Sequence, residues 1–208
     1  MKVILVNGSP NRDGCVNRAL QEVEKELKQA GIDTLIMQLG KKPIPGCVAC
    51  GACKQEHLCK VHDDIVNEFL KQAKDADGFI FGSPVYYAGI NGTLKSFMDR
   101  VFYAGGHEIF RLKPAAAVTS ARRAGTTSTF DTINKYFTIS EMPIVASTYW
   151  NNVHGSSAED VEKDLEGLQI MRNLGRNMAY WLQCQAVGAA KGLSKPIREA
   201  AYRSDFIE

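Results

Sequence analysis

Short apolar runs alternate with helical periodicity along almost the whole chain, and this alternation limits the folds open to it. Residues 3–6 are continuously apolar and lead into a turn at 7–10, and residues 16–30 then repeat apolar side chains at helical spacing. A short apolar run of this kind is typical of a parallel strand covered on both faces, and strands that alternate with helices form a doubly wound sheet. We therefore expect an α/β fold with a five-stranded parallel sheet.

The same pattern places elements along the rest of the chain. The expected strands are 3–6, 34–39, 79–82, 115–119 and 144–147. The expected helices are 16–30, 65–77, 91–103, 127–138 and 159–183. Asp63 and Asp64 stand where the N-cap and first-turn acids of the second helix belong. Because no repeat or linker divides the sequence, we expect a single domain over 1–208, with a cysteine-rich segment at 46–62 and a C-terminal helix and tail at 159–208.

Composition excludes several classes of partner. A net charge of +2 over 208 residues is too small to predict nucleic acid or a membrane surface as the main partner. The N-terminus enters an apolar strand directly, and no apolar run approaches the roughly 20 residues that a membrane span requires. We expect a cytoplasmic protein with no nucleic-acid and no membrane partner.

Four of the six cysteines lie within one short segment, spaced C-x2-C-x2-C-x5-C: Cys47, Cys50, Cys53 and Cys59. Such density indicates redox or metal chemistry in a reducing compartment. Four ligands so close together fit a 4Fe–4S cluster better than zinc, although free redox thiols and zinc stay open. The fourth cysteine is followed by Lys60 rather than proline, so the segment is not a ferredoxin insert. We expect His57 and His62 at the surface and Cys184 in the core.

The loop after the first strand, residues 8–17, predicts an anion site. It joins a strand to the N-terminus of a helix and offers hydroxyl, amide, guanidinium and backbone N–H groups, as a phosphate site does. It lacks both the Gly-Lys-Ser/Thr of a Walker A loop and the G-x-G-x-x-G of a dinucleotide fingerprint. An ordinary Gly/Ser/Pro turn is the alternative.

The loop after the third strand, residues 82–92, sets Tyr86 and Tyr87 among small residues. Small residues let a flat ring approach the backbone, and aromatic side chains give such a ring an apolar wall. Ligands bind at the carboxyl ends of the strands in this fold class, so both loops are expected at the same site. The alternative is a pair of ordinary half-buried tyrosines.

Together these segments closely resemble the flavodoxin-like NAD(P)H-dependent FMN reductases, and within them the iron–sulfur flavoprotein branch. The resemblance is carried, in order, by residues 8–10, 47–59, 63–64, 76–86 and 94–100. It implies a flavodoxin-like fold with sheet order 2-1-3-4-5, tightly bound FMN, and a homodimer or homotetramer with the flavin near a subunit interface.

The resemblance also assigns residues. It implies FMN phosphate contacts from Ser9, Asn11, Cys15, Val16 and Asn17. It implies isoalloxazine contacts from Pro84, Val85, Tyr86, Tyr87, Ala88 and Gly89, and contacts to the pyrimidine edge from the loop 120–125, including Ser120, Arg122, Arg123 and Gly125. One departure is that Gly14-Cys15-Val16 stands where relatives often have Gly-Asn-Thr, which removes an amide and a hydroxyl.

The implied activity is electron transfer from NAD(P)H through FMN to a quinone, nitro compound, azo compound or flavin. FMN performs the redox chemistry, so no residue need be a nucleophile or general base. Arg122 or Arg123 is the candidate for a positive charge that stabilises the reduced ring. Two alternatives stay open: the pair binds the phosphate of a nicotinamide cofactor, or it is solvated at the surface. Tyr149, Trp150 and His154 are candidates to cover a neighbouring subunit's flavin, with core packing the alternative for Trp150. Two other functions stay open, an electron carrier that takes electrons from ferredoxin and a thiol or flavin redox sensor.

Overall fold

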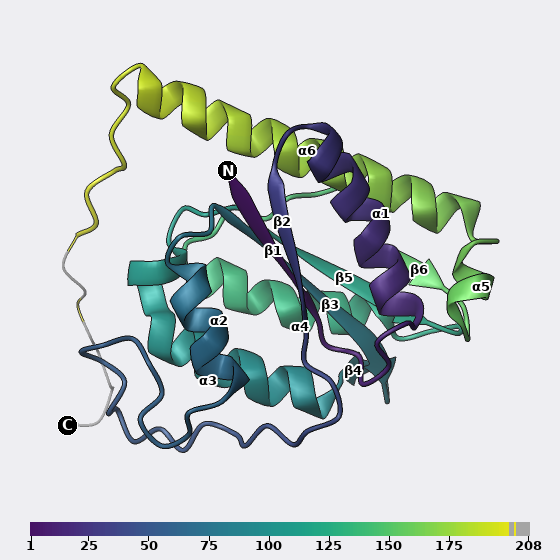
Figure 1. Ribbon diagram of the computed structural model, residues 1–208, viewed down its shortest axis with the longest axis horizontal. Helices are drawn as coiled ribbons and strands as arrows, with labels where there is room; N and C mark the ends of the chain where they lie inside the picture. Colours follow the sequence, from purple (N-terminus) through teal and green to yellow (C-terminus); the bar gives the residue numbers. More distant parts are fainter. Residues whose placement is uncertain (200–201, 203–208) are drawn as a thin grey trace.

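The computed structural model describes residues 1–199 and 202, and within them a parallel sheet separates two helical layers (Figure 1). The strands are β1 (Lys2–Asn7), β2 (Asp33–Gln38), β3 (Gly78–Tyr86), β5 (Ala115–Ala121) and β6 (Asn152–His154), in the order β2-β1-β3-β5-β6. The short β4 (Gly89–Ile90) pairs antiparallel with β3. With β4 left out of the numbering, the parallel strands have the expected 2-1-3-4-5 order, and the predicted fold class is confirmed.

Each face of the sheet carries its own hydrophobic core. Helices α1 (Cys15–Gln29), α5 (Ala158–Val161) and α6 (Leu165–Ala190) cover one face with aliphatic side chains. Helices α2 (Ile65–Ala73), α3 (Gly92–Phe110) and α4 (Thr126–Ile139) cover the other face, where Phe69, Phe79, Phe81 and Phe110 form an aromatic cluster. None of the described helices combines the length and the apolar character that a bilayer crossing needs.

The predicted fifth strand at 144–147 is wrong. Only Ile144 bridges to Ala115, and the strand itself, β6, begins at Asn152. The reason is competition from α6. The carbonyl of Ala146 accepts from the Asn177 amide, and the Ser147 hydroxyl donates to the Ile170 carbonyl. These bonds draw the chain away from β5 before it returns as β6.

The predicted long helix at 159–183 is also wrong in its bounds. It is two helices, because Ser157 caps α5 and Asp164 starts a new helix by accepting from the Gly167 N–H at 2.9 Å. Helix α6 then continues to Ala190, and Cys184 lies exposed on it rather than in the core. Of the predicted tail, residues 200–201 and 203–208 lie outside the described residues.

Helix α3 is longer than the predicted 91–103. It reaches Phe110 through a kink at Gly106, whose φ of 50° only glycine adopts readily. Between β2 and α2 the chain has no strand or helix, and this stretch, which holds the four clustered cysteines, runs past α2 and α3 (Figure 1).

Candidate functional site

The loops that leave β1 and β3 are locked together at the carboxyl edge of the sheet. The Gly8 N–H donates to the Gly82 carbonyl at 2.9 Å, and the Asn91 amide donates to the Gly8 carbonyl at 2.7 Å. A Cβ atom at Gly8 would stand 2.7 Å from that Gly82 oxygen, so only glycine permits this approach. The two loops predicted to share a site therefore do lie side by side.

The first of these loops is shaped by its own polar groups. The Asn7 side chain accepts from the Ser9 N–H at 3.0 Å, and the Ser9 hydroxyl accepts from the Asn11 N–H at 3.1 Å. Helix α1 begins after Gly14 with no side-chain cap, so its first N–H groups have no side-chain acceptor in the described residues. A cavity of about 770 Å³ opens beside this loop, lined also by residues 156–159. Uncapped N–H groups at a helix start, close to a cavity, are suited to an anion.

The predicted phosphate contacts differ in what they can offer. Ser9 is buried, Asn11 is exposed, and Asn17 is partly exposed. The Val16 side chain is buried against Gly82, so this residue offers only its backbone. The Cys15 thiol contacts the Gly155 carbonyl at 3.4 Å, and burial, with Asp160 and Glu159 nearby, raises its pKa. At Cys15 and Val16, the backbone N–H groups are therefore the donors that remain for a phosphate.

The turn between β3 and β4 holds two non-glycine residues in the left-handed region. Tyr87 has φ 49° and Ala88 has φ 56°, which is the backbone of a type I′ hairpin, normally formed by Asn-Gly. Tyr87 is fully exposed at the hairpin tip and Tyr86 is about half exposed, so the alternative of two half-buried tyrosines is wrong for Tyr87 and fits Tyr86. Such strain in a loop persists only where surroundings fix it, and it is typical of ligand sites.

The loop after β5 packs directly on this hairpin. Gly125 has φ 91°, and a Cβ atom there would approach the Ala88 Cα and the Val85 Cγ1 to 2.8 Å. Ser120 is buried at the end of β5, whereas Arg122 and Arg123 are exposed and form no ion pair with any described residue. The loops after β1, β3 and β5 therefore converge at one edge of the sheet, and two unpaired cations border that edge.

Two aromatic side chains are exposed just before β6. Tyr149 and Trp150 are about half exposed, and their ring centroids lie 4.9 Å apart in an edge-to-face arrangement. Core packing of Trp150 is thus wrong. His154, also exposed, closes β6 and has its backbone N–H bound by Asp164 at 2.7 Å.

The four clustered cysteines line a single small cavity together with His62, Arg100 and Tyr103. The cavity encloses about 20 Å³, little more than the space of a water molecule. Cys47 and Cys50 are exposed on its outer side, while Cys53 is buried. Among residues 1–199 and 202, no three His, Cys, Asp or Glu side chains converge closely enough to hold a single metal ion.

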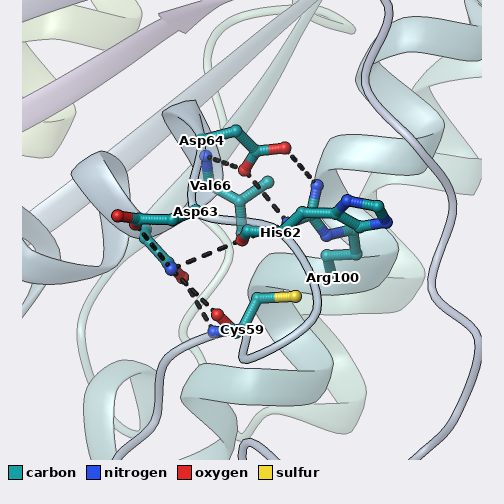
Figure 2. Close-up of polar contacts among 7 residues, drawn as sticks. Cys59, His62, Asp63, Asp64, Val66 and Arg100 are labelled. Carbon is teal, nitrogen blue, oxygen red and sulfur yellow. Dashed lines mark hydrogen bonds and ion pairs between the residues drawn. The ribbon is translucent and has the colours of Figure 1, made fainter.

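Cys59 is fixed by two helices. The Asn67 side chain, on α2, accepts from the Cys59 N–H at 2.7 Å and donates to the Cys59 carbonyl at 2.9 Å, as a neighbouring strand would. From α3, Arg100 reaches the same region and binds both oxygens of Asp64, at 2.6 and 3.0 Å (Figure 2). Asp64 also caps α2 by accepting from the Val66 N–H, so of the two predicted acids Asp64 is the N-cap and Asp63 lies before the helix.

The charge of Arg100 lies next to the cysteine cavity. Burial raises the pKa of the Cys59 thiol, but the His62 N–H and the Arg100 guanidinium outweigh that effect, so the pKa lies below its ordinary value. Burial raises the pKa of Cys53 instead. His57 is half-buried, with its ring against the Ala104 carbonyl at 3.0 Å, so its predicted surface position is wrong in part.

Sequence reasoning did not assign a role to Arg100 or Asn67. One signal was available for Arg100. It stands between Met98 and Val101 on a helix face that is otherwise apolar, and an arginine there needs a buried partner. Asn67 carries no such signal, because an asparagine in the first turn of a helix is ordinary.

The NADPH-dependent FMN reductase family profile matches residues 1–156. The chain belongs to this family. An iron–sulfur flavoprotein of Methanocaldococcus jannaschii is 35% identical over 186 residues, which are 86% of this chain and 96% of that protein. An iron–sulfur flavoprotein of Methanosarcina thermophila is 25% identical, over 88% of this chain and 96% of that protein. The predicted branch is confirmed, since these curated relatives are iron–sulfur flavoproteins, and the protein is an FMN-dependent oxidoreductase.

Solved structures agree on the fold. A flavone reductase superposes with a TM-score of 0.70 at 17% identity, covering 89% of this chain and 64% of that one. A flavodoxin from the Archaea gives a TM-score of 0.58 at 14% identity, covering 88% and 99%. At such identities the likeness concerns the fold alone.

Proposed function

We propose that this flavoprotein takes electrons from NAD(P)H and passes them through FMN to a small acceptor, namely a quinone, a nitro or azo compound, or a free flavin. The observation that carries the proposal is the convergence of three loops, after β1, β3 and β5, on one edge of the sheet, with a strained hairpin held against Gly125. When bound, FMN supplies the hydride and electron transfer chemistry.

Each loop has a distinct task in this proposal. Ser9, Asn11 and Asn17 bind the FMN phosphate together with the backbone of Cys15 and Val16, which fits the uncapped start of α1. The ring lies against Pro84, Val85, Tyr86, Tyr87, Ala88 and Gly89 on one side of the site. Its pyrimidine edge meets Ser120, Gly125 and the two arginines.

Arg122 and Arg123 act as electrostatic tuners. Both are exposed, and neither pairs with a carboxylate in the described part of the chain, so their charge is available to an incoming group. A positive charge near the flavin stabilises the ring once it carries extra negative charge. The same guanidinium groups offer bidentate donors to a nicotinamide cofactor's phosphates.

A second candidate function is electron relay through a 4Fe–4S cluster held by Cys47, Cys50, Cys53 and Cys59, with ferredoxin as the donor. Its support is that all four thiols line one cavity beside a buried arginine. The Cys47 sulfur also accepts from the Ala49 N–H at 3.5 Å, a contact typical of cysteine ligands. Because the cavity encloses only about 20 Å³, the exposed Cys47 and Cys50 must move outward to admit a cluster. A thiol redox sensor is the remaining alternative.

We further propose that residues 1–208 form one domain, that the protein is cytoplasmic, and that it assembles as a homodimer or homotetramer. Tyr149 and Trp150 then cover the flavin of a neighbouring subunit, which accounts for an exposed aromatic pair just before β6.

The test is anaerobic purification followed by measurement of FMN content and of NADH and NADPH oxidation with several acceptors. We expect about one FMN per subunit, because one set of three loops converges. Turnover with NAD(P)H supports the reductase, whereas reduction by ferredoxin alone favours the relay. A colourless protein that does not bind added FMN would contradict both.

A further inference from the structure

Arg100 is a buried cation that one counter-ion does not fully satisfy. Its side chain is 2% exposed, and Nη1 and Nη2 bind Asp64 while Nη2 also donates to the His62 carbonyl at 3.1 Å. Its Nε is buried and has no hydrogen-bond partner in the described residues. Leaving a buried donor unused costs about 1–3 kcal/mol, so the arrangement indicates an acceptor that binds there in function.

The chemistry of the surroundings identifies that acceptor. Arg100 lines the cavity that the four cysteines line, and Figure 2 shows the Cys59 sulfur on the same side as the guanidinium. A neutral thiol is a weak acceptor, whereas a thiolate that binds iron is an anion and accepts strongly. The free Nε–H of Arg100 therefore matches an iron-bound thiolate rather than a neutral thiol.

Cys59 is also fixed at its backbone. Asn67 binds both its N–H and its carbonyl, while Cys47 and Cys50 are exposed. Helix α2 thus holds the backbone of Cys59, and Arg100 of α3 faces its sulfur. An outer partner that orients a ligand is a common feature of metal centres.

We propose that Arg100 is a positioning residue that donates its Nε–H to the sulfur of Cys59 when Cys59 is a ligand of the 4Fe–4S cluster, and that it thereby raises the reduction potential of the cluster. The proposal rests on the second candidate function above. Reduction adds negative charge to the cluster, and a buried cation with an N–H···S bond stabilises the reduced form more than the oxidised form. Asp64 keeps Arg100 in place and offsets part of its charge.

The experiment compares three variants with the wild-type protein after anaerobic reconstitution. Arg100→Met removes charge and donor. Arg100→Met with Asp64→Asn removes both charges and retains an oxygen that can cap α2. Arg111→Gln removes a paired arginine just beyond the far end of α3 and is the matched control. The measured quantities are iron, sulfide and FMN per subunit and the cluster potential from an EPR-monitored titration.

The expected result is a lower potential in Arg100→Met, a smaller lowering in the double variant, and no change in Arg111→Gln. If Arg100→Met does not fold, the double variant carries the test, because it leaves no charge unpaired. An unchanged potential would overturn the proposal and leave Arg100 as a link between α2 and α3. Wild-type protein that binds FMN without iron would overturn it too, yet leave the reductase function standing. A cluster with the expected shifts in protein that lacks FMN would contradict the reductase and support Arg100.

Discussion

Tyr87, Ala88 and Gly125 show at the residue scale how conformation marks the candidate site. A left-handed backbone costs a non-glycine residue about 1–2 kcal/mol, and two adjacent residues bear that cost in the hairpin tip. Gly125 packs against Ala88 and Val85 with no room for a side chain. The sequence predicted which residues lie here but not their strain, because Tyr-Ala is not a turn sequence that favours positive φ.

Gly125→Ala tests this packing. The added methyl group meets Ala88 and Val85, and the backbone conformation is also strained, so we expect a loss of about 1–3 kcal/mol in unfolding free energy. We also expect FMN affinity to fall by about tenfold or more, a change of about 1.4 kcal/mol. Gly192→Ala is the control, since Gly192 has φ 85° with no neighbour within 4 Å. Equal FMN affinity in both variants would mean that the hairpin does not touch the flavin.

Replacing both Arg122 and Arg123 by alanine tests their charge. Hydrogen bonds to charged groups contribute about 1.5–3 kcal/mol, so kcat/KM for NAD(P)H should fall by roughly tenfold to a hundredfold. Thermal unfolding should stay unchanged, because both side chains are exposed. The control replaces the exposed Lys25 and Lys71 by alanine. Kinetics identical to those of the control would assign the arginine pair to solvent.

At the scale of elements, α1 and α6 pack closely, and ion pairs between their side chains join them along the contact. Gly175 permits the approach, since a Cβ atom there would come within 2.8 Å of Glu26. Glu22 binds Arg172 at 2.7 Å and Arg18 at 2.8 Å, and Glu26 binds Arg176 at 2.8 Å. These acids lie on a helix that the apolar pattern alone predicted.

The Glu22 contact predicts a pH dependence. Burial raises the pKa of the Glu22 carboxyl, but hydrogen bonds from Arg172 and Arg18 outweigh burial, so the pKa lies below its ordinary value. A lowered pKa stabilises the folded state above the unfolded pKa of about 4.3, and the stabilisation is lost as pH falls through the folded value. We expect Glu22→Gln to lose about 1–3 kcal/mol at neutral pH and to converge with wild type in acid, by denaturant titration.

Glu24→Gln on the same helix is the control for this measurement. Glu24 pairs with Lys28, whose side chain is well exposed, so we expect a loss of less than about 1 kcal/mol. A Glu22→Gln variant with the same small loss at every pH would contradict the assignment.

Strands were predictable from their apolar pattern where no distant part of the chain competed for their hydrogen bonds. Strands β1, β2 and β5 lie where the pattern places them, while β3 starts as predicted but continues to Tyr86, into the segment predicted as a loop. The strand at 144–147 failed because the Asn177 side chain of α6 donates to the Ala146 carbonyl and the Ser147 hydroxyl donates to the Ile170 carbonyl of the same helix. Strand β4 is a two-residue element that periodicity does not detect.

At the scale of the whole molecule, the proposed FMN site and the cysteine cavity are held in place by different parts of the fold. The loops proposed for FMN leave the sheet, while the cysteine cavity is held by residues of α2 and α3. The sequence predicted both sites as segments. It did not predict their supports, because Asp64 and Arg100 are 36 residues apart and only the folded helices bring them together.

Separate supports predict separate stability of the two centres. Exposure of anaerobically reconstituted protein to air should remove iron and sulfide, since Cys47 and Cys50 are exposed, and should leave FMN at about one per subunit. Iron and sulfide assays beside the flavin absorbance provide the measurement. Loss of FMN in step with iron would show that the two sites share a support.

The stretch from Gly40 to Asp63 contributes no strand to the sheet and no helix to either layer. A shortened connection between β2 and α2 would therefore leave every strand pairing in place. In evolution, such an insert can be gained, trimmed or rewritten without refolding the flavin scaffold that carries it. For protein engineering, moving this segment to another host would require the polar partners Asn67, Asp64 and Arg100, and also an apolar surface on that host to receive Cys53, Ile44 and Leu58.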